Sequence, residues 1–238
     1  MEPEETLFLR GRLRVYQYER GFRFGIDSVL LANFIELRFR DRALEIGAGC
    51  GLISFIAKVR FPYAKIYLLE KDPLYTKALK RGILANEFYQ ELFPIQGEAL
   101  KLPFKGNYFD VVYLNPPYFK TASGRKSPYK LKELAKREEV FCLESALQEA
   151  SHVLKNGGRF YIIFTAHRLA ELIQLLLKAK LEPKVLRMVH SYPGGEAKRI
   201  LIKAIKGAKS EIRILPPLYI YQKKGGNYSP EVKNFLEP

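Results

Sequence analysis

The chain has 238 residues, a formal net charge of +15 and an apolar content of 47%, which suit one well-buried α/β domain. Its two cysteines make a disulfide framework or a zinc site implausible, and no apolar run approaches the length that crosses a membrane. The first five residues are acidic and lack a signal-peptide pattern. We therefore expect a cytoplasmic protein with no metal and no membrane partner.

Local patterns predict the elements in chain order. Residues 6–18 alternate polar and apolar side chains around Gly11, which predicts a β-hairpin. The apolar-rich segment 28–37 predicts a helix, with Asp27 or Ser28 as its N-cap. Short apolar runs then alternate with helical patterns, as is typical of a doubly wound parallel sheet. The predicted strands are 42–46, 65–70, 92–95, 109–114 and 159–165, and the predicted helices are 51–60, 73–86, 139–154 and 168–177.

The last quarter of the chain predicts a closing pair of strands. These lie at about 184–190 and 199–205 and meet near Pro193. Residues 207–238 are rich in proline and glycine and predict an appendage. We therefore expect a single domain over 1–238, with an N-terminal hairpin and helix in 1–38, a Rossmann-like core in 39–206 and the appendage after it.

A glycine-rich turn lies between the first predicted core strand and its helix. Gly47, Gly49 and Gly51 allow the backbone to turn sharply and to approach a ligand closely. Their spacing differs from the Gly-x-Gly-x-x-Gly of dinucleotide sites, and the Gly-Lys-Ser/Thr of a P-loop is absent from the sequence. The turn predicts a nucleotide-type binding corner.

Acidic residues lie at or just after the carboxyl ends of three predicted strands. Glu70 lies about 20 residues after the glycine turn, where a carboxylate accepts hydrogen bonds from ribose hydroxyls in doubly wound folds. Glu45, just before the glycine turn, suits a cationic ligand. Glu98 and Ala99 suit an adenine pocket, and Lys71, next to Glu70, is expected in the lining of the same binding site. Each acid alone could be a solvated or capping side chain, but together they predict a binding cleft.

The tetrapeptide Asn115-Pro116-Pro117-Tyr118 follows the predicted strand 109–114. The two prolines end the strand and fix the backbone. The Asn115 side-chain oxygen and the Pro116 carbonyl can each accept an N–H bond, and the Tyr118 ring can stack on a flat group. This corner suits a planar group that bears an NH2, and such an amine needs no strong base because it loses its proton after attack. The alternative is an ordinary Pro-Pro loop.

Taken together, the glycine turn, Glu70 and the Asn-Pro-Pro-Tyr corner resemble the class I S-adenosylmethionine-dependent methyltransferases of the N-P-P-Y type. The segments 22–32, 115–120, 135–138 and 226–231 are similar to the bacterial tRNA (adenine-N6)-methyltransferase family that acts on valine tRNA next to the anticodon. The resemblance implies a seven-stranded Rossmann-like methyltransferase sheet whose last strand is antiparallel. It also implies S-adenosyl-L-methionine as the cofactor, and methylation of the N6 amine of adenine in RNA, with tRNA as the expected partner.

The same resemblance implies roles for individual residues. Asn115, Pro116, Pro117 and Tyr118 are expected to hold the target base. The expected cofactor-binding residues are Phe24, Asp27, Glu45, Gly47, Gly49, Gly51, Glu70, Lys71, Glu98, Ala99 and Asn115.

Positive charge gathers in two segments. Residues 119–137 carry a net charge of +6 and residues 178–238 a net charge of +8, so the rest of the chain contributes +1. Lysine and arginine beside a predicted active site suggest that a nucleic-acid backbone passes nearby, although a solvated basic surface is the alternative. The expected RNA contacts are Lys120, Arg125, Lys126, Lys130, Lys132 and Arg137.

Three other functions stay open from the sequence. Methylation of a release-factor glutamine uses the same tetrapeptide, but in longer chains with an N-terminal helical domain. Methylation of DNA adenine would require a DNA-recognition region that is not obvious here. A non-catalytic RNA-binding protein could also keep this fold. The sequence leaves the oligomeric state open.

Overall fold

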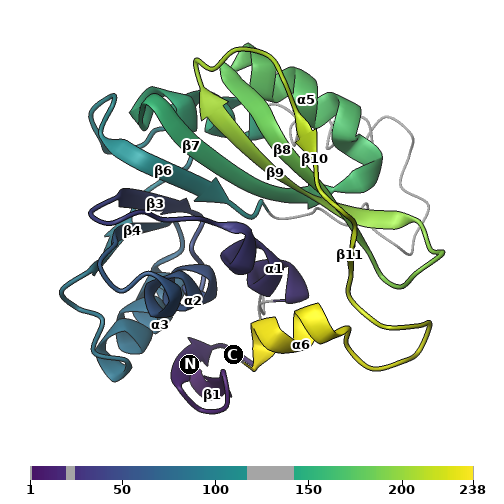
Figure 1. Ribbon diagram of the computed structural model, residues 1–238. Helices are drawn as coiled ribbons and strands as arrows, with labels where there is room; N and C mark the ends of the chain where they lie inside the picture. Colours follow the sequence, from purple (N-terminus) through teal and green to yellow (C-terminus); the bar gives the residue numbers. More distant parts are fainter. Residues whose placement is uncertain (1, 20–24, 117–141, 238) are drawn as a thin grey trace, which may run out of the picture.

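The computed structural model describes residues 2–19, 25–116 and 142–237. Its centre is a twisted mixed sheet with the strand order β10-β8-β9-β7-β6-β3-β4-β5, in which β11 also pairs with β8 (Figure 1). The strands of this sheet are β3 (Arg42–Ile46), β4 (Lys65–Glu70), β5 (Leu92–Gln96), β6 (Phe109–Leu114), β7 (Leu154–Thr165), β8 (Leu181–His190), β9 (Ala197–Lys206), β10 (Arg213–Ile214) and β11 (Leu218–Tyr219).

Strand direction agrees with the expected sheet. The pairs β3–β4, β4–β5, β3–β6 and β6–β7 are parallel, whereas β9 is antiparallel to both β7 and β8. The doubly wound sheet with an antiparallel last core strand is therefore confirmed. Because β8 then runs parallel to β7, the carboxyl ends of β3 through β8 all lie at one edge of the sheet.

The expected total of seven strands is too small. Within the described residues the sheet has nine strands, because β10 and β11 from the predicted appendage add to the outer edge of β8. Each has only two residues, which is too short for an alternating pattern to reveal. They form hydrogen bonds with main-chain N–H and C=O groups of β8 that would otherwise be unpaired at the edge of the sheet.

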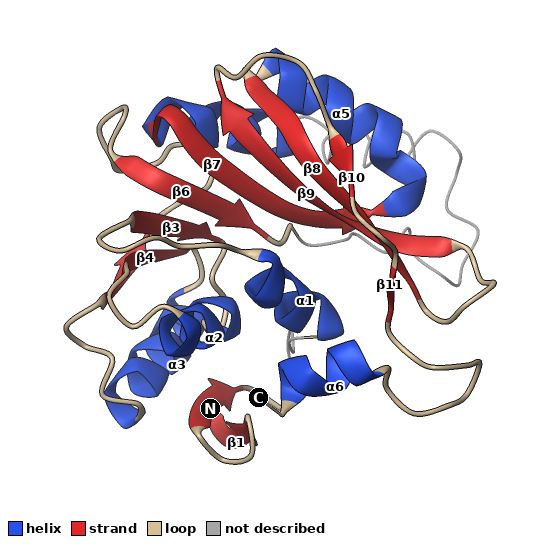
Figure 2. Ribbon diagram, in the orientation of Figure 1, coloured by secondary structure: helices blue, strands red, loops and turns tan. Residues whose placement is uncertain are grey.

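Helices cover both faces of the sheet, which buries an apolar core on each side (Figure 2). One core joins the sheet to α1 (Ile26–Phe34), α2 (Leu52–Arg60), α3 (Pro73–Ala85) and α6 (Pro230–Leu236). The other joins it to the helix at 142–153 and to α5 (Leu169–Lys178). Alternate residues of one strand feed opposite cores, as in β6, where Val111 and Val112 belong to different clusters.

The boundaries of two predicted elements are wrong. Helix α1 has Gly25 as its N-cap and ends at Phe34. The predicted N-caps Asp27 and Ser28 bond through their side chains to Arg199 and Asn115 instead. Strand β7 begins at Leu154 rather than at Arg159, because Leu154 already pairs with Phe109 on β6. The register then shifts before Arg159 pairs with Val111.

The predicted N-terminal hairpin is confirmed. Strands β1 (Glu4–Phe8) and β2 (Leu13–Gln17) pair antiparallel in a separate two-stranded sheet. Leu13 and Val15 are fully buried in the core that α2 and α3 share. The side chain of Asn86 accepts a hydrogen bond from the Arg14 N–H at 2.9 Å and donates to the Arg14 carbonyl at 2.7 Å. The hairpin is therefore fixed to the end of α3.

A buried ion pair ties the centre of the sheet to the segment that enters it. The Arg159 guanidinium on β7 contacts the Asp41 carboxylate just before β3, and both side chains are at most 10% exposed. Arg159 also donates to the Glu36 carbonyl at 2.8 Å. Arg159 thus joins β7 to the segment 36–41, which is more than 110 positions away in the sequence.

We predict that Asp41→Ala lowers the free energy of unfolding by about 3–5 kcal/mol, because the substitution leaves the buried guanidinium of Arg159 without its countercharge. Urea denaturation at neutral pH measures this change. The matched control is Glu196→Ala, which removes an exposed partner of Lys198 and should leave the unfolding midpoint almost unchanged. Equal midpoints for the two variants would contradict the prediction.

Candidate active site

The glycine turn after β3 has the backbone shape that only glycine adopts easily. Gly47, Gly49 and Gly51 have φ angles of +73°, +55° and +82°, all in the left-handed region. At Gly51 a side chain is also excluded by space, since a Cβ atom would lie 2.5 Å from Leu79 and 2.9 Å from Phe55. Gly51 is the N-cap residue of α2, so the turn leads directly into that helix.

Glu70 at the end of β4 holds this turn. Its carboxylate accepts hydrogen bonds from the Gly49 N–H at 2.7 Å and from the Asp72 N–H at 2.9 Å. The Leu69 carbonyl accepts from the N–H groups of both Gly47 and Ala48 at 2.9 Å. The acid predicted from its spacing therefore lies against the glycine turn.

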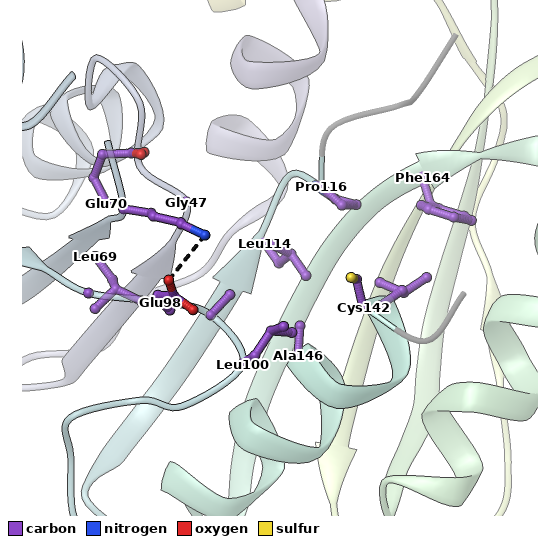
Figure 3. A pocket seen from close by; sticks show the side chains of 14 residues that line it. Gly47, Leu69, Glu70, Glu98, Leu100, Leu114, Pro116, Cys142, Ala146 and Phe164 are labelled. Atoms are coloured by element: carbon purple, nitrogen blue, oxygen red, sulfur yellow. Dashed lines mark ion pairs between the residues drawn. The ribbon is translucent and has the colours of Figure 1, made fainter. Parts of the chain in front are cut away.

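A cavity of about 290 Å³ opens beside these residues (Figure 3). Five of the predicted cofactor-binding residues line it, namely Gly47, Glu70, Lys71, Glu98 and Ala99. Lys71 and Glu98 form an ion pair of 3.0 Å with both side chains largely exposed to solvent. The remaining lining is mainly apolar. An apolar cavity flanked by a glycine turn and a carboxylate is suited to a nucleoside. Contact of the ribose with Glu70 stays a prediction.

The Asn-Pro-Pro-Tyr corner reaches the same cavity. Pro116 belongs to its lining. The adjacent Asn115 follows β6, and its Nδ2 atom donates to the Ser28 hydroxyl at 3.4 Å. This bond uses one of the two Nδ2 hydrogens, and Oδ1 is the acceptor atom of the side chain. Pro117 and Tyr118 lie outside the described residues.

Two of the predicted cofactor-binding side chains contact protein groups away from the cavity lining. The Asp27 carboxylate forms an ion pair of 2.9 Å with Arg199 on β9. The Glu45 carboxylate is 1% exposed and accepts from the Ser54 N–H at 3.2 Å and from the Ser54 hydroxyl. For both residues, contact with the cofactor stays a prediction.

The remaining predicted site residues lie outside the described part of the chain. They are Phe24 on the cofactor side and the RNA contacts Lys120, Arg125, Lys126, Lys130, Lys132 and Arg137.

Glu45 belongs to a buried polar chain beneath the glycine turn. The Ser54 hydroxyl also bonds to the Tyr113 hydroxyl at 2.6 Å, and all three side chains are buried. Loss of hydration raises the pKa of Glu45 to about 8, and burial likewise raises the pKa of Tyr113 well above its ordinary value. This hydrogen-bond network therefore links β3, α2 and β6 through side chains that are mostly uncharged at neutral pH.

Part of the cavity wall was not predicted from the sequence. Cys142, Leu143 and Ala146 reach it from the helix at 142–153, and Phe164 reaches it from β7. Phe164 lies near the carboxyl end of a parallel strand, a signal that could have identified it. The helix residues carry no comparable pattern, because their apolar side chains equally suit a core position.

The sequence and the fold were compared with known proteins. A family model described as the methyltransferase small domain matches residues 23–184. A tRNA1(Val) (adenine(37)-N6)-methyltransferase of Porphyromonas gingivalis is 30% identical, over 98% of this chain and 94% of the relative. A relative of the same name from Dyadobacter fermentans is 26% identical, over 99% of this chain and 97% of the relative. The crystal structure of a "predicted O-methyltransferase" from Agrobacterium tumefaciens has a TM-score of 0.72 at 20% identity, covering 88% of this chain and 94% of the other.

The last match shows the same fold. The chain belongs to the methyltransferase small domain family, and its cofactor is S-adenosylmethionine. Within the described residues, none of the helices is long and apolar enough to span a membrane. In the same part of the chain, no three His, Cys, Asp or Glu side chains form a candidate metal site.

We predict that Glu70→Ala raises the dissociation constant of S-adenosylmethionine at least about tenfold, since one charge-assisted hydrogen bond contributes roughly 1.5–3 kcal/mol. Isothermal titration measures the constant. Glu87→Ala, an exposed position after α3, is the control. An unchanged constant in Glu70→Ala would exclude a cofactor role for this acid.

A second prediction concerns pH. Because folded Glu45 keeps its proton up to about pH 8, against an ordinary pKa of 4.5, the unfolded chain binds fewer protons between these values. This group therefore lowers the free energy of unfolding as pH rises from about 4.5 to about 8. The free energy of unfolding of Glu45→Gln minus that of the wild type should therefore increase across that interval. Urea denaturation of both proteins at several pH values measures it, and a constant difference would contradict the prediction.

Proposed function

We propose that this protein transfers the methyl group of S-adenosylmethionine to the exocyclic N6 amine of an adenine in tRNA. The observation that carries the proposal is the position of Asn115, whose amide donates to Ser28 next to the cavity that Pro116 lines. The names of the relatives support the choice of adenine and of tRNA.

The residues at the corner act on the amine by position. The Asn115 oxygen and the Pro116 carbonyl accept one N–H bond each, which draws the NH2 group to a fixed place at the cavity wall. The cofactor supplies a methyl group on a positively charged sulfur. As the new N–C bond forms, the S–C bond breaks, and the amine nitrogen loses one proton to solvent. The protein therefore contributes alignment and exclusion of water rather than a strong base.

An adenine inside a stacked helix cannot reach a cavity at the edge of a sheet. The target base has to leave its stack, which costs least in a loop or in another unpaired segment. This requirement favours an RNA loop over duplex DNA. The acceptor corner by itself also accommodates the amide of a glutamine, so methylation of a protein is the second candidate to test.

We predict that Asn115→Ala lowers turnover by at least about a hundredfold, because the amine loses its aligned acceptor. The affinity for S-adenosylmethionine should stay within about twofold, since the cavity keeps its glycine turn and Glu70. Tritium transfer to unmodified tRNA, with parallel titration of the cofactor, measures both quantities.

The control is Asn107→Ala, at a turn before β6 on the opposite edge of the sheet. Equal turnover in Asn115→Ala and the wild type would exclude the assigned role. Digestion of the labelled tRNA to nucleosides identifies the product. Label in duplex DNA or in a release factor, with none in tRNA, would overturn the proposed substrate while leaving methyl transfer intact.

A further inference from the structure

The segment between β11 and α6 forms a small, well-anchored hairpin at the edge of the sheet (Figure 1). Its strands meet at an isolated bridge between Tyr221 and Tyr228, and the Gln222 N–H donates to the Asn227 carbonyl at 2.9 Å. The tip closes with a bond of 3.0 Å from the Gly226 N–H to the Lys223 carbonyl. We call residues 221–228 the C-terminal hairpin.

Both ends of this hairpin are held by buried residues. Ile220 and Ser229 flank it and are at most 9% exposed, and the Ser229 N–H donates to the Ile220 carbonyl at 2.9 Å. Beyond it, α6 is fixed to the sheet by two bonds of 2.6 and 2.8 Å from Arg187 on β8 to Glu231. The hairpin therefore presents its side chains from a rigid support.

The side chains of the hairpin are aromatic and basic. The rings of Tyr221 and Tyr228 stack nearly parallel, with centroids 5.2 Å apart and planes 12° apart, yet the two residues are 37% and 40% exposed. Lys223 and Lys224 at the tip are exposed, and neither forms an ion pair with a described residue. An exposed aromatic face beside uncompensated lysines matches what an unpaired base and its phosphate require.

The sheet places this hairpin on the same edge as Asn115. Strands β6, β7, β8 and β11 run in one direction, so Asn115 and the C-terminal hairpin both follow the carboxyl ends of strands. In the order β6-β7-β9-β8-β11, their strands are four spacings apart, or roughly 19 Å measured across the strands. A few nucleotides on either side of a bound base cover that distance.

We propose that the C-terminal hairpin is a second RNA-docking site, which stacks an unpaired base on the tyrosine pair and binds the adjoining phosphates through Lys223 and Lys224. This inference rests on the proposed function for the identity of the RNA. It assigns a role to residues outside the cavity and outside the basic segment 119–137. It also gives the excess positive charge of residues 178–238 a specific place to act.

The test compares charge reversal at two places. Lys223→Glu/Lys224→Glu should raise the dissociation constant for unmodified tRNA about tenfold and reduce the slope of its logarithm against log salt by about 1.4, or 0.7 for each lost phosphate contact of a single strand. The control is Lys65→Glu/Lys80→Glu, two exposed positions on β4 and α3 with the same change in net charge. Fluorescence anisotropy measures binding, and thermal melting confirms that both variants are folded.

The aromatic pair needs its own comparison. Tyr221→Ala/Tyr228→Ala should weaken tRNA binding about tenfold, whereas Tyr221→Phe/Tyr228→Phe keeps the rings and should bind like the wild type. Tyr63→Ala/Tyr89→Ala, two exposed tyrosines before β4 and β5, is the control. With saturating tRNA, turnover in the alanine variant should match the wild type, since the methyl-transfer site is untouched.

The outcomes separate this inference from the proposed function. Unchanged tRNA affinity and salt slope in the charge-reversed hairpin overturn the docking site, whatever the wild type methylates. A weakening no larger than in the control variants overturns it as well, because the effect would then be one of net charge or of surface area. Absence of methylated adenine with the wild type overturns the proposed function, while the binding comparison still decides the role of the hairpin.

Discussion

The register of the parallel strands is the constraint on which the active site depends. Ile46 on β3 pairs with Leu69 on β4 and with Leu114 on β6. The next residues along the three strands are Gly47, Glu70 and Asn115, so the glycine turn, the acid beside it and the acceptor corner all leave the sheet at one level. Adjacent strands lie about 4.8 Å apart, which brings groups separated by up to 68 positions of sequence to the same cavity.

Polar contacts behind this edge keep the three groups in place. The buried hydrogen-bond network from Glu45 through Ser54 to Tyr113 joins β3, α2 and β6, on the face of the sheet that α2 covers. The buried Ser28 hydroxyl of α1 accepts a hydrogen bond from the Asn115 amide. An acceptor that aligns an amine has to be held still, because misplacement of the reacting atoms by about 1 Å can cost a hundredfold in rate. The buried network and α1 together supply that rigidity.

Features with strong local signals appear in the structure. The sharp turn predicted at the three glycines is confirmed by their positive φ angles, and Glu70, one helix and one strand later, bonds to that turn. Predictions were less successful where contacts between residues distant in the sequence determine the local structure. The predicted N-caps of α1, Asp27 and Ser28, bond to Arg199 and Asn115 instead, and no local pattern reveals such partners. Cys142 and Phe164 line the cavity because the fold brings the helix at 142–153 and β7 together, and their sequence positions alone did not indicate this.

The sequence by itself determined the class of chemistry, because the glycine turn, the spaced acid and the Asn-Pro-Pro-Tyr corner each follow from the residues of one short segment. It also determined the alternation of strands and helices, since hydrophobic periodicity is local. Only the tertiary structure decided that Glu45 lies buried against Ser54, that β10 and β11 extend the sheet, and that the C-terminal hairpin lies on the same edge as Asn115. These features depend on strand order and on pairing between residues distant along the chain, which periodicity does not encode.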